Sequence, residues 1–138
     1  LIKYIRNLDK EIKFDNQNHH EYRYKTLYEK TPIMLHSINS KGELVSVSDH
    51  WLMKLGYERE EVIGKKSVDF LTDESRKYAS EIVIPDFNQK GYCFNIEYQF
   101  VKKNGEVIDT ILSATSERDS NGALVRSLAV IIDITERK

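Results

Sequence analysis

Apolar and polar residues alternate along the C-terminal third of the chain, with the period of two that is typical of β-strands. The first such segment spans residues 92–100, and its apolar positions are Tyr92, Phe94, Ile96, Tyr98 and Phe100. Asn104-Gly105 supplies a hairpin turn, so we expect residues 107–116 to pair with this segment. A second turn at residues 119–122 leads to residues 124–134, which are too apolar to leave one strand face in open water. The pattern predicts three strands joined in a meander.

Another hairpin is predicted earlier in the chain. Residues 33–38 and 44–48 are strand-like, and Asn39-Ser40-Lys41-Gly42 between them combines turn-forming residues with a glycine suited to positive φ. Helical segments separate this hairpin from the meander. The sequence therefore favours an α+β fold.

The helices between the two groups of strands are short. The first is expected to bury Trp51, Leu52 and Leu55, and Gly56 suits the left-handed conformation that ends helices. Its expected N-cap is Ser48 or Asp49.

Further helical segments follow in the same region. Residues 58–64 and residues 67–71 are expected to form two short ones, the first opened by glutamates and stopped by a glycine. A longer helix begins at Thr72 or Asp73. We expect Pro85 to kink or end it near Ile84, because proline lacks a backbone donor.

An apolar stripe marks the N-terminal segment, where Leu1, Ile5, Leu8 and Ile12 recur at steps of four, three and four. This spacing is typical of a two-stranded coiled coil, although it also suits a helix packed on its own domain. After a polar break at residues 16–20, a second helix is expected over residues 21–29, with Tyr24, Leu27 and Tyr28 on one side. We divide the chain into a helical extension, residues 1–29, and a domain, residues 30–138.

Composition and charge narrow the function. The chain has 138 residues, 21 Lys plus Arg and 22 Asp plus Glu, so no overall field recruits nucleic acid or an anionic membrane. Cys93 is the single cysteine, which excludes an internal disulfide and a cysteine-rich zinc site. The longest apolar run, residues 128–132, is strand-sized, so the segment has no membrane span or signal peptide. We interpret it as a cytoplasmic piece of a longer protein, in which a membrane anchor would have to lie outside this segment.

Three separated motifs carry a family resemblance. They are LGYEREEVIGK, FVKKNGEVIDTILSA and ERDSNGALVRSLAVIIDITERK, and in this order they resemble the PAS sensory domain. The resemblance implies a five-stranded antiparallel sheet with short helices on one face. It also implies a signal-transducing module that binds a ligand or dimerises, here as a homodimer through the N-terminal helix.

The resemblance extends to the C-terminal end. Asp133-Ile134-Thr135 matches the motif at which this fold passes into a linker helix, and Asp133 or Thr135 would cap that helix. A C-terminal output domain is implied, as in histidine kinases, diguanylate cyclases or transcription regulators. Signal transfer is therefore assigned to Asp133 and Thr135.

A ligand cavity under the long helix is a further implication of the resemblance. Its expected lining is Trp51, Leu55, Tyr78, Ile82, Phe87, Ile96 and Tyr98. For the strand that carries Ile96 and Tyr98, the face that points to the cavity is predicted only to within a shift of one residue. The alternative is a ligand-free interaction and dimerisation module whose core is filled by its own aromatic side chains.

The sequence lacks the residues with which members of this family commonly bind haem or form a flavin adduct. Haem-binding members commonly use a histidine on the long helix, but residues 72–90 contain none, which argues against haem. Flavin-adduct members carry a reactive cysteine where this chain has GKKSVDFL, residues 64–71, so adduct chemistry is excluded. A flavin without an adduct and a small organic metabolite stay open, and no metal site is predicted. His36 is interpreted as a strand histidine with an ordinary hydrogen bond.

Catalysis is not expected, since the segment lacks nucleophile-elbow, phosphate-loop, zinc-protease and kinase motifs. Cys93 alternates with Phe94, so it is expected to face away from the aromatic side, as a buried inert thiol. Ion pairs are predicted between a glutamate of the second short helix and a lysine of the later hairpin turn. The candidates are Glu60, Glu61, Lys102 and Lys103.

Overall fold

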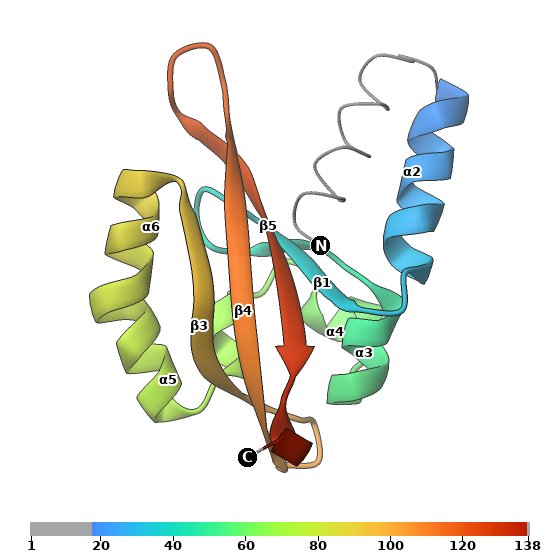
Figure 1. Cartoon of the computed structure of the whole chain (residues 1–138). Helices are drawn as coiled ribbons and strands as arrows, with labels where there is room; N and C mark the ends of the chain where they lie inside the picture. Colours follow the sequence, from blue (N-terminus) through green and yellow to red (C-terminus); the bar gives the residue numbers. More distant parts are fainter. Residues whose placement is uncertain (1–17, 138) are drawn as a thin grey trace.

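A five-stranded antiparallel sheet forms the centre of the protein (Figure 1). The computed structural model of the chain describes residues 18–137. The strand order is β2-β1-β5-β4-β3, so the last strand is central. The strands are β1 (Met34–Asn39), β2 (Leu44–Val47), β3 (Tyr92–Val101), β4 (Val107–Arg118) and β5 (Leu124–Asp133). The expected α+β fold and its two hairpins are confirmed.

Helices cover both faces of the sheet. They are α2 (Asn18–Lys30), α3 (Asp49–Leu55), α4 (Arg59–Val62), η1 (Ser67–Phe70), α5 (Asp73–Tyr78), η2 (Ala79–Val83), α6 (Ile84–Lys90) and η3 (Thr135–Arg137). α2 begins three residues earlier than the expected helix start at Glu21. The predicted stripe of Leu1, Ile5, Leu8 and Ile12 lies outside the described residues. No helix among residues 18–137 has the length and apolar character needed to cross a membrane.

Two groups of buried residues pack on opposite faces of the sheet. Tyr28 of α2 packs with Leu35 and Val130, whereas the neighbouring strand residues Met34 and Ile131 join the larger core under α3 to α6. Since successive strand residues point to opposite faces, α2 lies on the face opposite the short helices (Figure 1).

The start and stop signals of α3 act as expected. The Ser48 hydroxyl accepts a hydrogen bond from the Trp51 backbone N–H at 3.2 Å. The same hydroxyl accepts from Leu35 N–H at 3.0 Å and donates to the Ile33 carbonyl at 2.7 Å. Gly56 ends α3 at φ 82°, a left-handed conformation that side-chain-bearing residues rarely adopt. Ser48 thereby ties α3 to the first strand.

The long helix does not end at Pro85, so of the two predicted outcomes, a kink or an end, the end is wrong. Helical structure continues to Lys90, and the π-helical segment η2 directly precedes the proline. Ile84 N–H bonds to the Ala79 carbonyl five residues earlier. In a regular α-helix the proline ring clashes with the carbonyl four residues earlier, and the wider π-helical turn changes the backbone geometry at that place.

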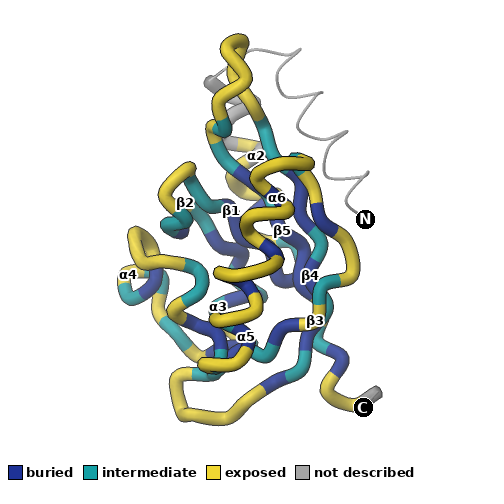
Figure 2. The backbone as a smooth tube through the Cα atoms, turned by 90° about the vertical axis from the view of Figure 1, so that its left-hand side faces the viewer, coloured by how far each residue is buried: buried dark blue, intermediate teal, exposed yellow. Residues whose placement is uncertain are grey.

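One stripe of the long helix faces the sheet. Buried positions recur every four residues from α5 through α6, between exposed segments (Figure 2). They are Ser75, Ala79, Val83 and Phe87.

A β-bulge in β3 reverses the expected facing of its first half. Asn95 adopts φ 57°, and the pairing with β4 shifts between Cys93 and Ile96. A bulge inserts one residue, so side chains on its two sides change faces relative to a regular alternation. Phe94 is 52% exposed, while Cys93 is buried together with Tyr98. The predictions of one continuous aromatic face and of a Cys93 that faces away from it are therefore wrong, whereas the predicted burial of Cys93 is confirmed.

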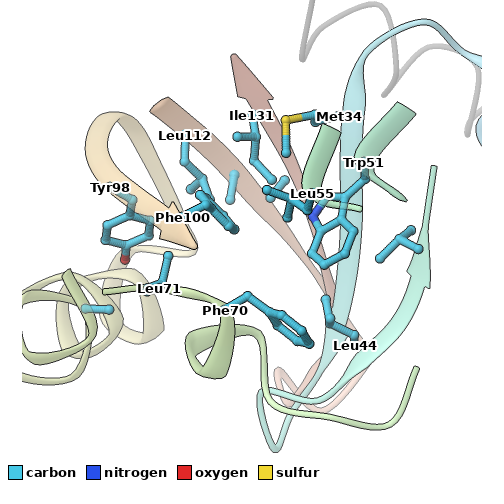
Figure 3. Packing of buried hydrophobic residues seen from close by; sticks show 14 of the residues in the cluster. Met34, Leu44, Trp51, Leu55, Phe70, Leu71, Tyr98, Phe100, Leu112 and Ile131 are labelled. Atoms are coloured by element: carbon cyan, nitrogen blue, oxygen red, sulfur yellow. The ribbon is translucent and has the colours of Figure 1, made fainter. Parts of the chain in front are cut away.

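The main core joins the sheet to the short helices (Figure 3). Trp51 is fully buried, and its ring meets Phe70 edge to face at a centroid distance of 5.5 Å. Phe70 meets Tyr57 in the same way at 5.1 Å. Such edge-to-face contacts add to the stabilisation from burial. This end of the core is filled by side chains.

Candidate ligand-binding cavity

A cavity of about 70 Å³ lies between the long helix and the inner face of the sheet. Val83 and Phe87 line it from the helix side. Tyr98, Phe100 and Leu112 line it from β3 and β4, on the strands shown in Figure 3. The lining is mostly apolar, because the helix stripe and the inner strand positions face each other.

Two of the seven expected lining residues, Phe87 and Tyr98, contribute to this cavity. Trp51 and Leu55 lie in the filled part of the core instead. Ile96 packs against the core beside the bulge and outside the lining. The bulge explains this shift, which single-sequence alternation does not reveal.

The two remaining expected residues are on the outer side of the helix. Ile82 is 58% exposed, because it precedes Val83 and so points away from the sheet-facing stripe. Tyr78 is half-exposed and meets the ring of Tyr98 edge to face at 6.1 Å. Neither lines the cavity.

The cavity wall contains a buried histidine. Trp51 Nε1–H donates to His36 Nδ1 at 3.3 Å, which makes Nδ1 an acceptor and leaves the proton of the neutral ring on Nε2. Burial lowers the pKa of His36 to about 4, so the ring is neutral at physiological pH. Nε2 has no hydrogen bond to another residue among residues 18–137, and since no enclosed side-chain nitrogen or oxygen of this segment is left unsatisfied, Nε2 is not sealed off from the surrounding space. His36 therefore has the predicted hydrogen bond and also brings an N–H donor to the cavity.

A second polar group adjoins His36 across the strands. Ser127 of β5 pairs with Ile38, and Ala129 pairs with His36. Ser127 is 4% exposed and lines the cavity, with no side-chain hydrogen bond to another described residue. His36 and Ser127 thus bring two hydrogen-bonding groups from the sheet side to a mostly apolar space.

The other titratable groups of the wall are uncharged. Burial raises the pKa of the Tyr98 phenol further above its usual range. Burial likewise raises the pKa of the Cys93 thiol. A thiol reacts through its thiolate, so Cys93 is a packing residue and not a nucleophile.

A groove of about 370 Å³ adjoins the cavity. The two share six lining residues, Ile38, Ser67, Val68, Ile84, Phe87 and Ser127. The groove runs along the turn after β1 and past η1, and it includes Lys41 and Lys66. Sequence reasoning assigned Lys41 to a turn only, and no local pattern links it to Lys66.

Size decides which ligands fit. The cavity alone has about half the ~150 Å³ of an engineered cavity that admits benzene. A three-ring flavin does not fit in that volume. Together with the groove, the space enters the range of about 300–1,000 Å³ that is usual for small-molecule sites. No cluster of three or more potential metal ligands occurs in the described part of the chain.

The C-terminal junction is held by a compact polar network. Asp133 Oδ1 accepts from the Thr135 backbone N–H at 2.9 Å and from its hydroxyl at 2.6 Å. Thr135 Oγ1 also accepts from Asp109 N–H at 3.0 Å. Asp133 Oδ2 pairs with Lys54 Nζ of α3 at 3.0 Å. Burial alone would raise the pKa of Asp133, but the hydrogen bonds of Thr135 and the Lys54 ion pair outweigh it and lower the pKa.

One of the candidate ion pairs between the second short helix and the later hairpin turn is present. Lys103 Nζ lies 2.6 Å from Glu61 Oε1, and the Lys103 backbone N–H donates to the Leu55 carbonyl at 2.8 Å. Lys102 instead contacts Glu106 in its own turn at 3.9 Å. Glu60 has no ion pair with any residue of the described segment. The Glu61–Lys103 pair is exposed, so it fixes orientation more than it stabilises.

Comparison with known proteins agrees with this architecture. The family profile described as a PAS domain matches residues 30–136. The chain belongs to the PAS domain family. A comparison with curated proteins gave no match.

Solved PAS structures share the fold. The PAS domain of a protein from Colwellia psychrerythraea has a TM-score of 0.76 at 16% identity, over 84% of this chain and 98% of that one. A PAS domain from a two-component sensor histidine kinase has a TM-score of 0.69 at 14% identity, over 85% and 99%. The LOV domain of the Erythrobacter litoralis EL346 blue-light activated histidine kinase has a TM-score of 0.67 at 15% identity, over 77% and 99%. At these identities the likeness concerns the fold.

Proposed function

We propose that this PAS domain is a sensory module, which responds to a small molecule in its cavity and regulates an output domain outside this segment. The observation that carries the proposal is the pair of buried hydrogen-bonding groups, His36 and Ser127, in the wall of an apolar space. No fully enclosed side-chain nitrogen or oxygen of the described residues lacks a hydrogen-bond partner, so these two groups are not sealed off and are in reach of a molecule that enters the cavity. The module itself is regulatory, and any catalysis belongs to the output domain.

A short chain of contacts supports signal transfer from the cavity to the C-terminal junction. His36 bonds to Trp51 of α3, and the same helix carries Lys54. Lys54 pairs with Asp133, which in turn holds Thr135. A ligand that moved His36 would thereby bias the position of α3 and of the junction.

The central strand provides a second connection. β5 contributes Ser127 and Ala129 to the cavity and ends at Asp133. Ligand binding would act by shifting the populations of two arrangements, and its effect is limited by its differential affinity for them.

Xenon tests whether the cavity accepts an occupant, because this gas enters apolar cavities without needing polar partners. We expect xenon under pressure to shift the backbone amide resonances of His36, Ser127 and Phe87 in NMR spectra. A Leu112→Phe variant, which fills the space, should lose these shifts. Unchanged spectra of the original protein would favour the alternative, a ligand-free interaction and dimerisation module.

Dimerisation through the N-terminal helix stays a prediction. Replacement of Ile5 and Leu8 by Asp would place charges in the expected seam and convert a dimer into a monomer in sedimentation. An unchanged mass would contradict pairing through this helix.

A further inference from the structure

The entrance to the cavity carries two lysines and has one carboxylate, Glu43, nearby. Lys41 and Lys66 are the charged residues of the groove, and neither the groove nor the cavity has an aspartate or glutamate in its lining. Lys66 Nζ donates to the Lys41 carbonyl at 3.2 Å, which holds this ammonium group beside the β1–β2 turn. Two lysines that come from different loops thus meet at one opening.

The nearest acidic side chain, Glu43, offsets only part of the charge of the two lysines. Glu43 pairs with Lys66 in an antiparallel β-bridge, and its Oε1 accepts from Asn39 Nδ2 at 3.0 Å, which leaves its negative charge in place. Glu43 is not part of the groove lining. Two lysines against one glutamate leave the opening with a net positive charge, which favours an anion.

Polarity changes along the path from the opening inward. The groove has the hydroxyls of Ser67 and Ser127 at its boundary with the cavity. Phe87 lies at the same boundary, and beyond it the walls include Leu112 and Ala114, with the N–H of His36 on one side. A molecule that matches this sequence has an anionic end at the opening and an apolar body inside.

We propose that the site binds a small carboxylate with an apolar body, its carboxylate at Lys41 and Lys66 and its body against Phe87 and Leu112. This inference rests on the proposed sensory function and specifies the ligand class. The cavity of about 70 Å³ limits the enclosed part to a few carbon atoms, and a longer body extends into the groove. An acceptor atom on the body would match the His36 N–H.

A pair of nearly isosteric probes isolates the charge. Pentanoate and pentanamide have the same four-carbon tail, and their affinities are measured by NMR titration of the His36, Ser127 and Phe87 amides. We expect pentanoate to bind about fourfold more tightly, since two partly exposed ion pairs each contribute about twofold. Substitution of both Lys41 and Lys66 by Gln should abolish this preference. Lys65→Gln is the matched control, because Lys65 adjoins Lys66 in sequence but lies outside the lining.

The outcomes separate the ligand class from the sensory function. Equal binding of the two probes, or a preference that survives in the Lys41→Gln, Lys66→Gln variant, would overturn the carboxylate assignment and leave a sensor of neutral molecules. Absence of binding by either probe would also overturn it, while the xenon response tests the cavity independently. Both lysines are exposed, so loss of folding is not expected, and circular dichroism checks it.

Discussion

The buried neutral His36 makes stability fall in mild acid. Burial lowers the pKa of its ring from 6.5 to about 4 in the folded protein. As the pH decreases below 6.5, His36 becomes protonated in the unfolded chain but stays neutral in the folded protein. Protonation therefore stabilises the unfolded state, and the free energy of unfolding falls until the pH approaches the pKa of the folded protein. The full difference corresponds to about 3 kcal/mol, at about 1.4 kcal/mol per pKa unit.

Most of this loss falls between neutral pH and the range in which carboxylates titrate. Between about pH 7 and about pH 5, the two pKa values give a loss of about 2 kcal/mol from His36 alone. Asp133 and Glu61 have lowered pKa values, so their contributions are lost only at lower pH. The loss of stability between about pH 7 and about pH 5 therefore reports on His36 and not on these acidic groups.

Urea denaturation at the two pH values measures the effect, with His36→Gln as the comparison. A glutamine amide oxygen can still accept from Trp51 Nε1–H, but it does not titrate in this range. We expect the variant to lose about 2 kcal/mol less than the original protein as the pH falls from about 7 to about 5. Equal losses in the two proteins would refute the assignment of a buried neutral imidazole to this site.

Three further predictions concern other parts of the structure. Ser48→Ala removes the N-cap of α3 and two bonds to β1-side backbone, so it should lower the free energy of unfolding by about 3 kcal/mol, whereas Ser40→Ala in an exposed turn should have little effect in the same urea titration. Cys93 should react with a thiol reagent roughly 100-fold more slowly in the folded than in the unfolded protein, and fast labelling of the native state would contradict its burial. Glu61→Gln should leave the urea midpoint nearly unchanged, because its pair with Lys103 is exposed, and a large shift would show that the pair is structurally essential.

Sequence patterns predict the elements whose signals are local. Ser48 and Gly56 mark the ends of α3 because each acts on backbone groups a few residues away. The hairpin turns follow from residues that tolerate positive φ, such as Gly42. At these positions the interacting groups lie only a few residues apart in sequence, so the local sequence is enough to predict the structure.

The facing of β3 shows where local patterns fail. Its alternation of aromatic residues is regular in sequence, but the bulge at Asn95 divides the strand into two halves that face differently. Asparagine adopts left-handed conformations more readily than most residues, so its presence in a strand was the one available signal. The bulge places Cys93, not Phe94, in the cavity wall.

The candidate site depends on contacts between distant positions. His36 and Trp51 are 15 residues apart, and Lys54 and Asp133 are 79 residues apart. Lys41 and Lys66 come from separate loops that the sheet and η1 bring together. Periodicity and capping carry no information on such pairs, which is why the family resemblance located the cavity only approximately.

The central claim is that occupancy of the cavity reaches the C-terminal junction, and amide NMR under xenon pressure tests it directly. In the original protein we expect shifts at Asp133 and Thr135 in addition to those at His36 and Ser127. In a Lys54→Met variant, which keeps the stem of the side chain but removes its ion pair with Asp133, the cavity shifts should persist and the junction shifts should shrink. Shifts confined to the cavity in the original protein would contradict the account.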